Sequence, residues 1–177
     1  MRVILSTSVH SRLLFLTGFM GSGKTTVGKR LADRLAVSFI DIDAEIERKT
    51  GRTIRDIFAH DGEAVFRRLE SEMLSTISQL GTCAVVATGG GAVIDPNNRN
   101  LMRDSGLLIN LQVEYADVLN RLAHDQSRPL LQETDEVAVR ALMASRATAY
   151  ADADLVISTV GKTHLQIVGE IQEWLRR

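Results

Sequence analysis

Two carboxylates, Asp41 and Asp43, stand two residues apart at the end of an apolar run that begins at Phe39. In an extended chain, residues i and i+2 point to the same face, so two such carboxylates lie side by side and repel each other. The arrangement becomes favourable where cations occupy the space around the pair. We therefore expect Asp41 and Asp43 to belong to a site that gathers positive charge, although Asp41 by itself is also typical of a helix N-cap.

A second group of residues has the spacing of a phosphate-binding loop. The segment "GFMGSGKTT" contains Gly18, four residues, then Gly23, Lys24 and Thr25. Glycines at these positions let backbone N–H groups turn inward around an anion, and a helix that begins near Lys24 adds its positive dipole end. Lys24 can then reach the terminal phosphates, and the Thr25 hydroxyl can join the shell of a Mg²⁺ ion. The alternative is an ordinary glycine-rich turn.

The loop predicts a nucleotide but not a reaction, because GTPases, motor ATPases and small kinases all use it. The chain contains no N-K-x-D segment of the kind that recognises guanine, and 177 residues are few for a motor protein. These two observations favour a small kinase.

The elements that must position these residues alternate between short apolar runs and longer amphipathic ones. We predict strands at 13–17, 38–41, 83–88, 107–111 and 155–158. The four-residue spacing of Val27, Leu31 and Leu35 predicts the first helix. Further helices are predicted at 43–50, 53–60, 61–80, from Pro96 to near Gly106, 114–123, 135–150 and in a final segment that ends at Leu175. The polar segment 124–134 is expected to be a loop.

This alternation predicts a single α/β domain with a five-stranded parallel sheet covered by helices on both faces. Ligands of such sheets gather where the strands end. The phosphate loop follows the first predicted strand, the Asp41–Asp43 pair follows the second, and Gly89, Gly90 and Gly91 follow the third. These segments should meet at one edge of the sheet, although three successive glycines are also compatible with an ordinary turn.

Taken together, six segments resemble the shikimate kinase family in order and spacing, from about Leu13 to the final helix. They are "GFMGSGKTTVG", "FIDIDAEIE", "GRTIRDIFAHDGEAVFRRLESE", "VVATGGGAV", "SRPLL" and "SRATAY". The resemblance implies the P-loop kinase fold with a mobile lid at about 123–135. It also implies phosphorylation of the 3-hydroxyl of shikimate by ATP, with Mg²⁺ as cofactor.

The resemblance assigns a role to each matching position. Asp41 is similar to the carboxylate that holds Mg²⁺ through water, and Asp43 to the one that binds the reacting hydroxyl. The substrate-binding set that it implies is Asp43, Arg67, Glu70, Gly89, Gly90, Gly91 and Arg146. In this set Arg67 and Arg146 clamp the shikimate carboxylate, a task that suits the planar guanidinium.

The nucleotide side of the site follows from the same resemblance. The ATP-binding set is Gly21, Ser22, Gly23, Lys24, Thr25, Thr26, Arg121 and Arg128. Within it Arg121 is similar to an arginine that stacks on adenine, and Arg128 to a lid arginine that reaches the transferring phosphoryl group. The implied catalytic residues are Lys24, Asp43 and Arg128, and the implied metal ligands are Thr25 and Asp41.

The composition limits which partners the protein can bind and in which cellular compartment it is expected. The formal net charge is −1, so there is no polycationic surface of the kind that binds nucleic acid. No apolar run approaches the roughly 20 residues that span a bilayer. Cys83 is the only cysteine, so an internal disulfide is impossible and a cytoplasmic location is expected. We also expect Cys83 to be a small buried hydrophobe, residues 1–12 to be an N-terminal extension of a kinase domain spanning 1–177, and the enzyme to be a monomer.

Two other functions remain open at this point. A kinase of the same architecture acting on another hydroxy acid, such as a gluconate-type sugar acid, would turn over ATP with that acid and not with shikimate. A non-catalytic nucleotide-binding regulator would bind nucleotide without releasing ADP for any hydroxy acid. The second pocket formed by Asp43, Arg67 and Arg146 argues against the regulator.

Overall fold

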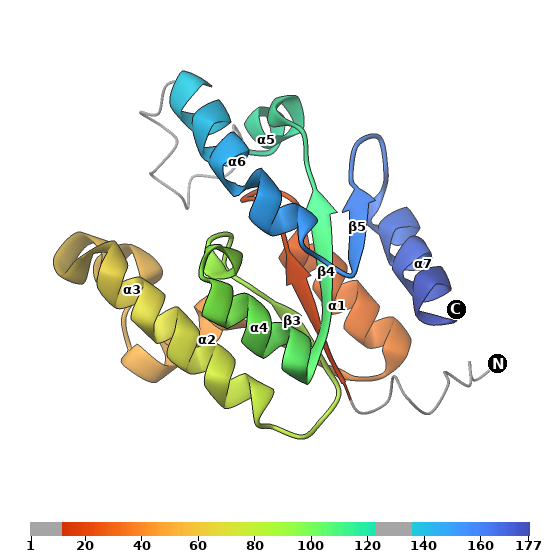
Figure 1. Cartoon of the computed structure of the whole chain (residues 1–177), viewed down its shortest axis with the longest axis horizontal. Helices are drawn as coiled ribbons and strands as arrows, with labels where there is room; N and C mark the ends of the chain where they lie inside the picture. Colours follow the sequence, from red (N-terminus) through yellow and green to blue (C-terminus); the bar gives the residue numbers. More distant parts are fainter. Residues whose placement is uncertain (1–11, 123–135) are drawn as a thin grey trace.

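The strands form one parallel sheet in the order β2-β3-β1-β4-β5 (Figure 1). A computed structural model of the chain describes residues 12–122 and 136–177. Over these residues the strands are β1 (Leu13–Thr17), β2 (Ser38–Asp41), β3 (Ala84–Ala87), β4 (Gly106–Gln112) and β5 (Leu155–Ser158). The predicted five-stranded parallel sheet is therefore confirmed, with strand bounds within one residue of those expected.

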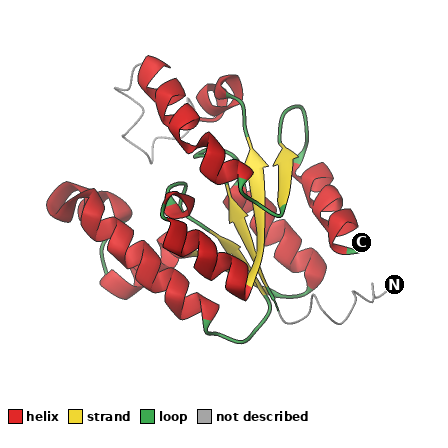
Figure 2. Cartoon of the chain, viewed as in Figure 1, coloured by secondary structure: helices red, strands yellow, loops and turns green. Residues whose placement is uncertain are grey.

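Helices cover both faces of this sheet, as Figure 2 shows. On one face lie α1 (Lys24–Leu35) and α7 (His164–Leu175), which share a core with Leu14, Leu16 and Ile109. The other face is covered by α2 (Ile42–Thr50), α3 (Ile54–Ser78), the short 3₁₀ helix η1 (Ala92–Ile94), α4 (Pro96–Ser105), α5 (Tyr115–Leu122) and α6 (Glu136–Ala151).

Burial on both faces explains the composition of the central strands. All five residues of β1, the segment "LLFLT", are buried, with Leu14 and Leu16 facing one core and Leu13 and Phe15 the other. A strand in this position has no solvent side, so it shows a continuous apolar run rather than an alternating one.

Two glycines shape the helices beside the site. Gly51 ends α2 in the left-handed conformation, with φ of 68°, as its predicted position between two helices requires. Gly62, with φ of 82° and ψ of 172°, interrupts α3, which covers the two predicted helices at 53–60 and 61–80. The long stretch of α3 after this kink carries both Arg67 and Glu70.

The strand register brings the segments of interest to one edge. Asp41 of β2 pairs with Ala87 of β3, and Ala87 pairs with Leu16 of β1. The segments that follow these strands, at 18–23, 42–43 and 88–91, therefore leave neighbouring strands at the same edge of the sheet. The expected meeting of the phosphate loop, the aspartate pair and the three glycines is confirmed.

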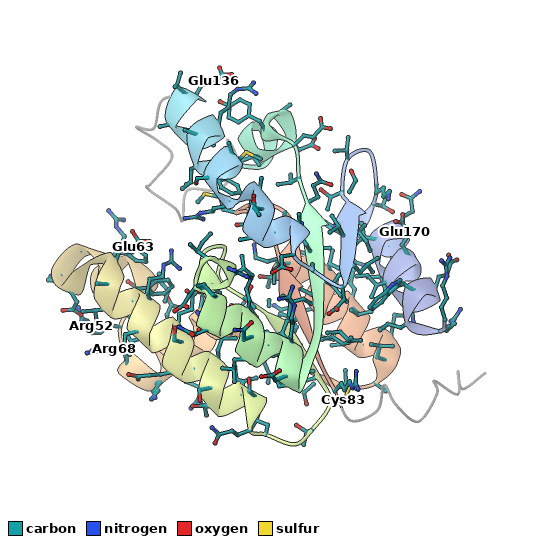
Figure 3. The ribbon with its side chains drawn as sticks, viewed as in Figure 1. Arg52, Glu63, Arg68, Cys83, Glu136 and Glu170 are labelled. Atoms are coloured by element: carbon teal, nitrogen blue, oxygen red, sulfur yellow. The ribbon has the colours of Figure 1, made fainter. Side chains whose placement is uncertain are left out.

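One prediction from the sequence is wrong, and two others concern residues that the structure does not describe. Cys83 is only partly buried, and its thiol donates to the backbone carbonyl of Arg12 (3.1 Å), so the prediction of a buried hydrophobe is wrong. Cys83, labelled in Figure 3, precedes β3 at the amino end of the parallel strands, whereas Asp41 ends β2 at their carboxyl end. The predicted lid at 123–135 and residues 1–11 of the predicted extension lie outside the described residues. In the described part of the chain, no helix has the length and apolar character to cross a membrane.

Candidate active site

The phosphate loop follows β1 and ends at the first turn of α1. Gly18 has φ of 140°, and a Cβ at this position would lie 2.5 Å from the Leu111 carbonyl oxygen, so only glycine fits there. Gly23 caps α1 with φ of 91°. The Lys24 ammonium donates to the carbonyls of Gly18 (2.8 Å) and Phe19 (3.0 Å), which holds its charge over the loop.

Thr25 and Asp41 meet across the edge of the sheet. The Thr25 hydroxyl donates to Asp41 Oδ2 at 2.9 Å, while Asp41 Oδ1 accepts from the backbone N–H groups of Asp43 (3.1 Å) and Ala44 (3.5 Å). Asp41 is therefore the N-cap of α2 as well as the neighbour of Thr25. The N-cap interpretation of Asp41 made from the sequence is therefore confirmed, and its role toward a cation stays a prediction.

This pair of oxygen donors fits a hydrated Mg²⁺. No group of three or more His, Cys, Asp or Glu side chains that could hold a metal occurs in residues 12–122 and 136–177. Mg²⁺ in nucleotide sites commonly takes one or two protein oxygens and completes its shell with water and phosphate oxygens. Thr25 and Asp41 provide a donor set of that kind beside the phosphate loop.

Asp43 and Glu70 approach each other across Gly89. A Cβ on Gly89 would lie 3.4 Å from Asp43 Oδ1 and would overlap Glu70 Oε1. The Glu70 side chain is completely buried, and its Oε1 has no hydrogen-bond partner among the described residues. A third carboxylate thus joins the predicted aspartate pair, and the absence of a side chain on Gly89 makes room for it.

The environment of Glu70 shifts its ionisation. Burial raises the pKa of the Glu70 carboxyl above its ordinary value of 4.5, the charge and hydrogen bond of Arg67 oppose this rise, Asp43 adds to it and Arg146 opposes it. The pKa of Glu70 is therefore affected by both predicted clamp arginines and by the predicted hydroxyl-binding aspartate. These residues form one electrostatic cluster.

Arg67 is held from two sides on α3. Its Nη1 donates to Glu70 Oε2 at 2.8 Å, and its Nε and Nη2 donate to Glu63 Oε1 at 3.1 and 3.0 Å. Burial lowers the pKa of the Arg67 guanidinium, but Glu70 and Glu63 together outweigh this and raise it. Gly91 packs against the guanidinium, since a Cβ there would lie 2.5 Å from Arg67 Cζ and Nη1. Glu63, labelled beside α3 in Figure 3, is exposed to solvent.

Arg146 reaches the same place from α6. Its Nη1 donates to the Gly90 carbonyl at 3.4 Å, and its guanidinium lies 5.9 Å from the ring of Phe19 in the phosphate loop. A cavity of about 860 Å³ opens between α3, α4 and α6, and Arg67 and Arg146 both line it. Its other lining residues are Glu63, Arg68, Ser71, Gly91, Ile94, Asp95, Asn98, Leu142 and Ser145.

For the remaining predicted ATP-binding residues, the structure gives a position in the fold for some and no description for others. Gly21, Ser22 and Thr26 lie in the phosphate loop and the first turn of α1, where Ser22 is buried. Arg121 belongs to α5, but its side chain is outside the described part of the structure. Arg128 lies in 123–135, also outside the described residues.

Comparison with known proteins decides the family. The family model described as shikimate kinase matches residues 20–176 of the chain. The chain belongs to the shikimate kinase family. A shikimate kinase of Geobacter sulfurreducens is 48% identical over an alignment of 179 positions, which covers 99% of this chain and 98% of that protein.

Solved structures agree with this assignment. The shikimate kinase from Acinetobacter baumannii in complex with shikimate has a TM-score of 0.87 and 37% identity, covering 93% of this chain and 92% of that one. A sugar kinase from Janibacter sp. HTCC2649 has a TM-score of 0.59 at 18% identity, covering 93% and 94% of the two chains. That second likeness shows a shared fold alone.

Two side chains of this shikimate kinase site escaped the sequence prediction. Glu63 Oε1 accepts hydrogen bonds from Arg67 Nε and Nη2, and the Tyr150 hydroxyl donates to the Gly90 carbonyl at 2.5 Å. Each lies four residues from a predicted clamp arginine, Glu63 from Arg67 and Tyr150 from Arg146, so each shares a helix face with it. Helical spacing around the clamp residues was therefore the signal that could have found them.

Proposed function

We propose that this chain transfers the γ-phosphoryl group of ATP to the 3-hydroxyl of shikimate through the residues brought together above. The observation that carries the proposal is the convergence of Arg67 and Arg146, from separate helices, on one cavity, while Asp43 acts electrostatically on Glu70, the partner of Arg67. A planar, bidentate group suits a carboxylate, and a neighbouring aspartate suits a hydroxyl. A hydroxylated acid of the size of shikimate needs both.

On the donor side, the phosphate loop and Lys24 bind the ATP phosphates. Thr25 would hold Mg²⁺ directly and Asp41 through water; when bound, the ion neutralises charge on the β- and γ-phosphates. Arg121 packs against adenine, and Arg128 reaches the transferring phosphoryl group from the segment 123–135. The contact of Thr25 with Asp41 and the position of Lys24 over the loop support this division.

On the acceptor side, Asp43 orients the 3-hydroxyl toward the γ-phosphate and accepts its proton late in the transfer. Arg67 and Arg146 bind the substrate carboxylate, and Glu70 holds Arg67 in place. The segment Gly89–Gly91 lets the substrate approach bare backbone. Because phosphoryl transfer has a loose transition state, the rate enhancement comes mainly from this alignment and from charge neutralisation.

The setting of the reaction belongs to the same proposal. The kinase domain spans 1–177, with 1–12 as an extension, and works as a monomer in the cytoplasm without nucleic-acid or membrane partners. The single cysteine and the net charge of −1 support the compartment and the absence of nucleic acid.

The clamp assignment is tested by changing each arginine to leucine. Arg67→Leu and Arg146→Leu should each weaken shikimate binding by about thirtyfold or more, because a desolvated charge contact contributes on the order of 2–5 kcal/mol. ATP binding should be nearly unchanged. Arg48→Leu, which removes an exposed arginine on α2, serves as the control. Isothermal titration that finds unchanged shikimate affinity in both clamp variants would contradict the assignment.

A further inference from the structure

The Gly90 carbonyl is a shared acceptor for two side chains of α6. Tyr150 Oη donates to it at 2.5 Å and Arg146 Nη1 at 3.4 Å. The Tyr150 hydroxyl is the closer donor of the two, and the Arg146 contact lies near the outer limit of hydrogen-bond length.

Gly90 also touches the phosphate loop. A Cβ on Gly90 would lie 3.5 Å from the Gly18 carbonyl oxygen, 3.6 Å from the Met20 backbone nitrogen and 3.7 Å from Tyr150 Oη. Gly90 thus lies between the loop that binds the phosphoryl donor and the helix that carries Arg146. The Tyr150 hydroxyl forms its hydrogen bond with Gly90 between these two elements.

The surroundings of Tyr150 keep its hydroxyl a donor. The side chain is 8% exposed, and burial raises the pKa of its phenol; the charge and hydrogen bond of Arg146 and the charge of Arg67 oppose the rise, and Glu70 adds to it. The raised pKa keeps the hydroxyl protonated at neutral pH, so it can donate to the Gly90 carbonyl.

We propose that Tyr150 is a positioning residue for substrate carboxylate recognition: by satisfying the Gly90 carbonyl, it leaves the Arg146 guanidinium available to the cavity. This inference rests on the proposed role of Arg146 in the clamp. Without the hydroxyl, the carbonyl keeps Arg146 as its one remaining side-chain donor from α6. Arg146 is then drawn onto the carbonyl, since an under-satisfied, partly buried acceptor is unfavourable, and its guanidinium turns away from the substrate carboxylate.

The test is Tyr150→Phe in the full chain, with shikimate and its neutral methyl ester as ligands. Affinity for shikimate should fall about fivefold, the range of a single hydrogen bond. Affinity for the ester should be nearly unchanged, because the ester lacks the charge that Arg146 recognises, and ATP affinity should also be unchanged. Tyr115→Phe removes the hydroxyl of the only other tyrosine and is the control.

The ratio of acid to ester affinity decides the outcome, and it does not depend on the fraction of folded protein. A lower ratio in Tyr150→Phe, together with a smaller loss of shikimate affinity from Arg146→Leu in the Tyr150→Phe background than in the wild type, supports the proposal. Equal losses for acid and ester, or an unchanged ratio, would overturn it. If Arg146→Leu itself leaves shikimate binding intact, the clamp assignment has failed rather than the role of Tyr150 alone.

Discussion

Replacing Gly91 with alanine should strongly weaken shikimate binding while the backbone keeps its fold. The new Cβ would lie 2.5 Å from Arg67 Cζ and Nη1, far inside van der Waals contact. Gly91 has φ of −102° and ψ of −7°, which alanine adopts without strain. The overlapping atoms are the far end of a flexible side chain, so Arg67 moves and the backbone does not.

The size of the effect follows from what Arg67 loses. A desolvated arginine–carboxylate contact contributes on the order of 2–5 kcal/mol. A displaced Arg67 keeps part of its attraction for the substrate, so we expect about 2–3 kcal/mol, or roughly 30- to 150-fold weaker shikimate binding. Global stability should fall by about 1–3 kcal/mol, because the displaced Arg67 loses its contact with the fully buried Glu70 carboxylate.

Isothermal titration with shikimate, together with chemical denaturation, separates these two effects. Gly169→Ala is the matched control, because a Cβ at this position in α7 meets nothing within 4 Å. Normal shikimate affinity in a folded Gly91→Ala protein would refute the placement of Arg67 as a substrate ligand. A loss of stability well beyond the roughly 1–3 kcal/mol expected for the Arg67–Glu70 contact would instead refute the view that only the side-chain end must move.

The remaining predictions concern carboxylates and the lid arginine. Asp41→Asn should raise the Mg²⁺ concentration needed for activity, whereas Asp43→Asn should lower kcat without shifting the Mg²⁺ titration; equal shifts in both variants would contradict this division. Because burial raises the pKa of Glu70 above 4.5, its stabilising contribution is present below that pH and is lost as pH rises through the folded-state pKa. The free energy of unfolding of the wild type relative to Glu70→Gln should therefore fall from about pH 4 to about pH 8 in denaturation experiments, and a rise would be inconsistent with the burial argument. Arg128→Ala should lose on the order of 10³-fold in kcat with little change in shikimate binding, and Arg128→Lys should recover only part; near-normal kcat at saturating substrates would exclude Arg128 from the chemistry.

Local patterns were sufficient to predict the elements and the loop. The run "LLFLT" followed by the Gly18–Thr25 spacing predicts a buried strand, a phosphate loop and a helix, and each is present. The carboxyl-end rule then correctly brings Asp41 and Gly89–Gly91 together. These predictions succeed because strand period, glycine conformation and helix start are set by neighbours in the sequence.

Contacts that depend on tertiary packing could not be predicted in the same way. Tyr150 and Gly90 are 60 residues apart, and no local pattern indicates that their hydrogen bond exists. The partial exposure of Cys83 depends on its place at the amino edge of the sheet, next to Arg12, rather than on its apolar neighbours. The order of the strands in the sheet likewise depends on long-range pairing.

Transfer of the γ-phosphoryl group to the 3-hydroxyl of shikimate can be tested directly by measuring ADP release from ATP over a small panel of hydroxylated acids. NMR then assigns the phosphorylated position. We predict turnover with shikimate, phosphorylation at its 3-hydroxyl, and little turnover with gluconate-type sugar acids. Turnover with a sugar acid and none with shikimate, or nucleotide binding without ADP release for every acid, would contradict it.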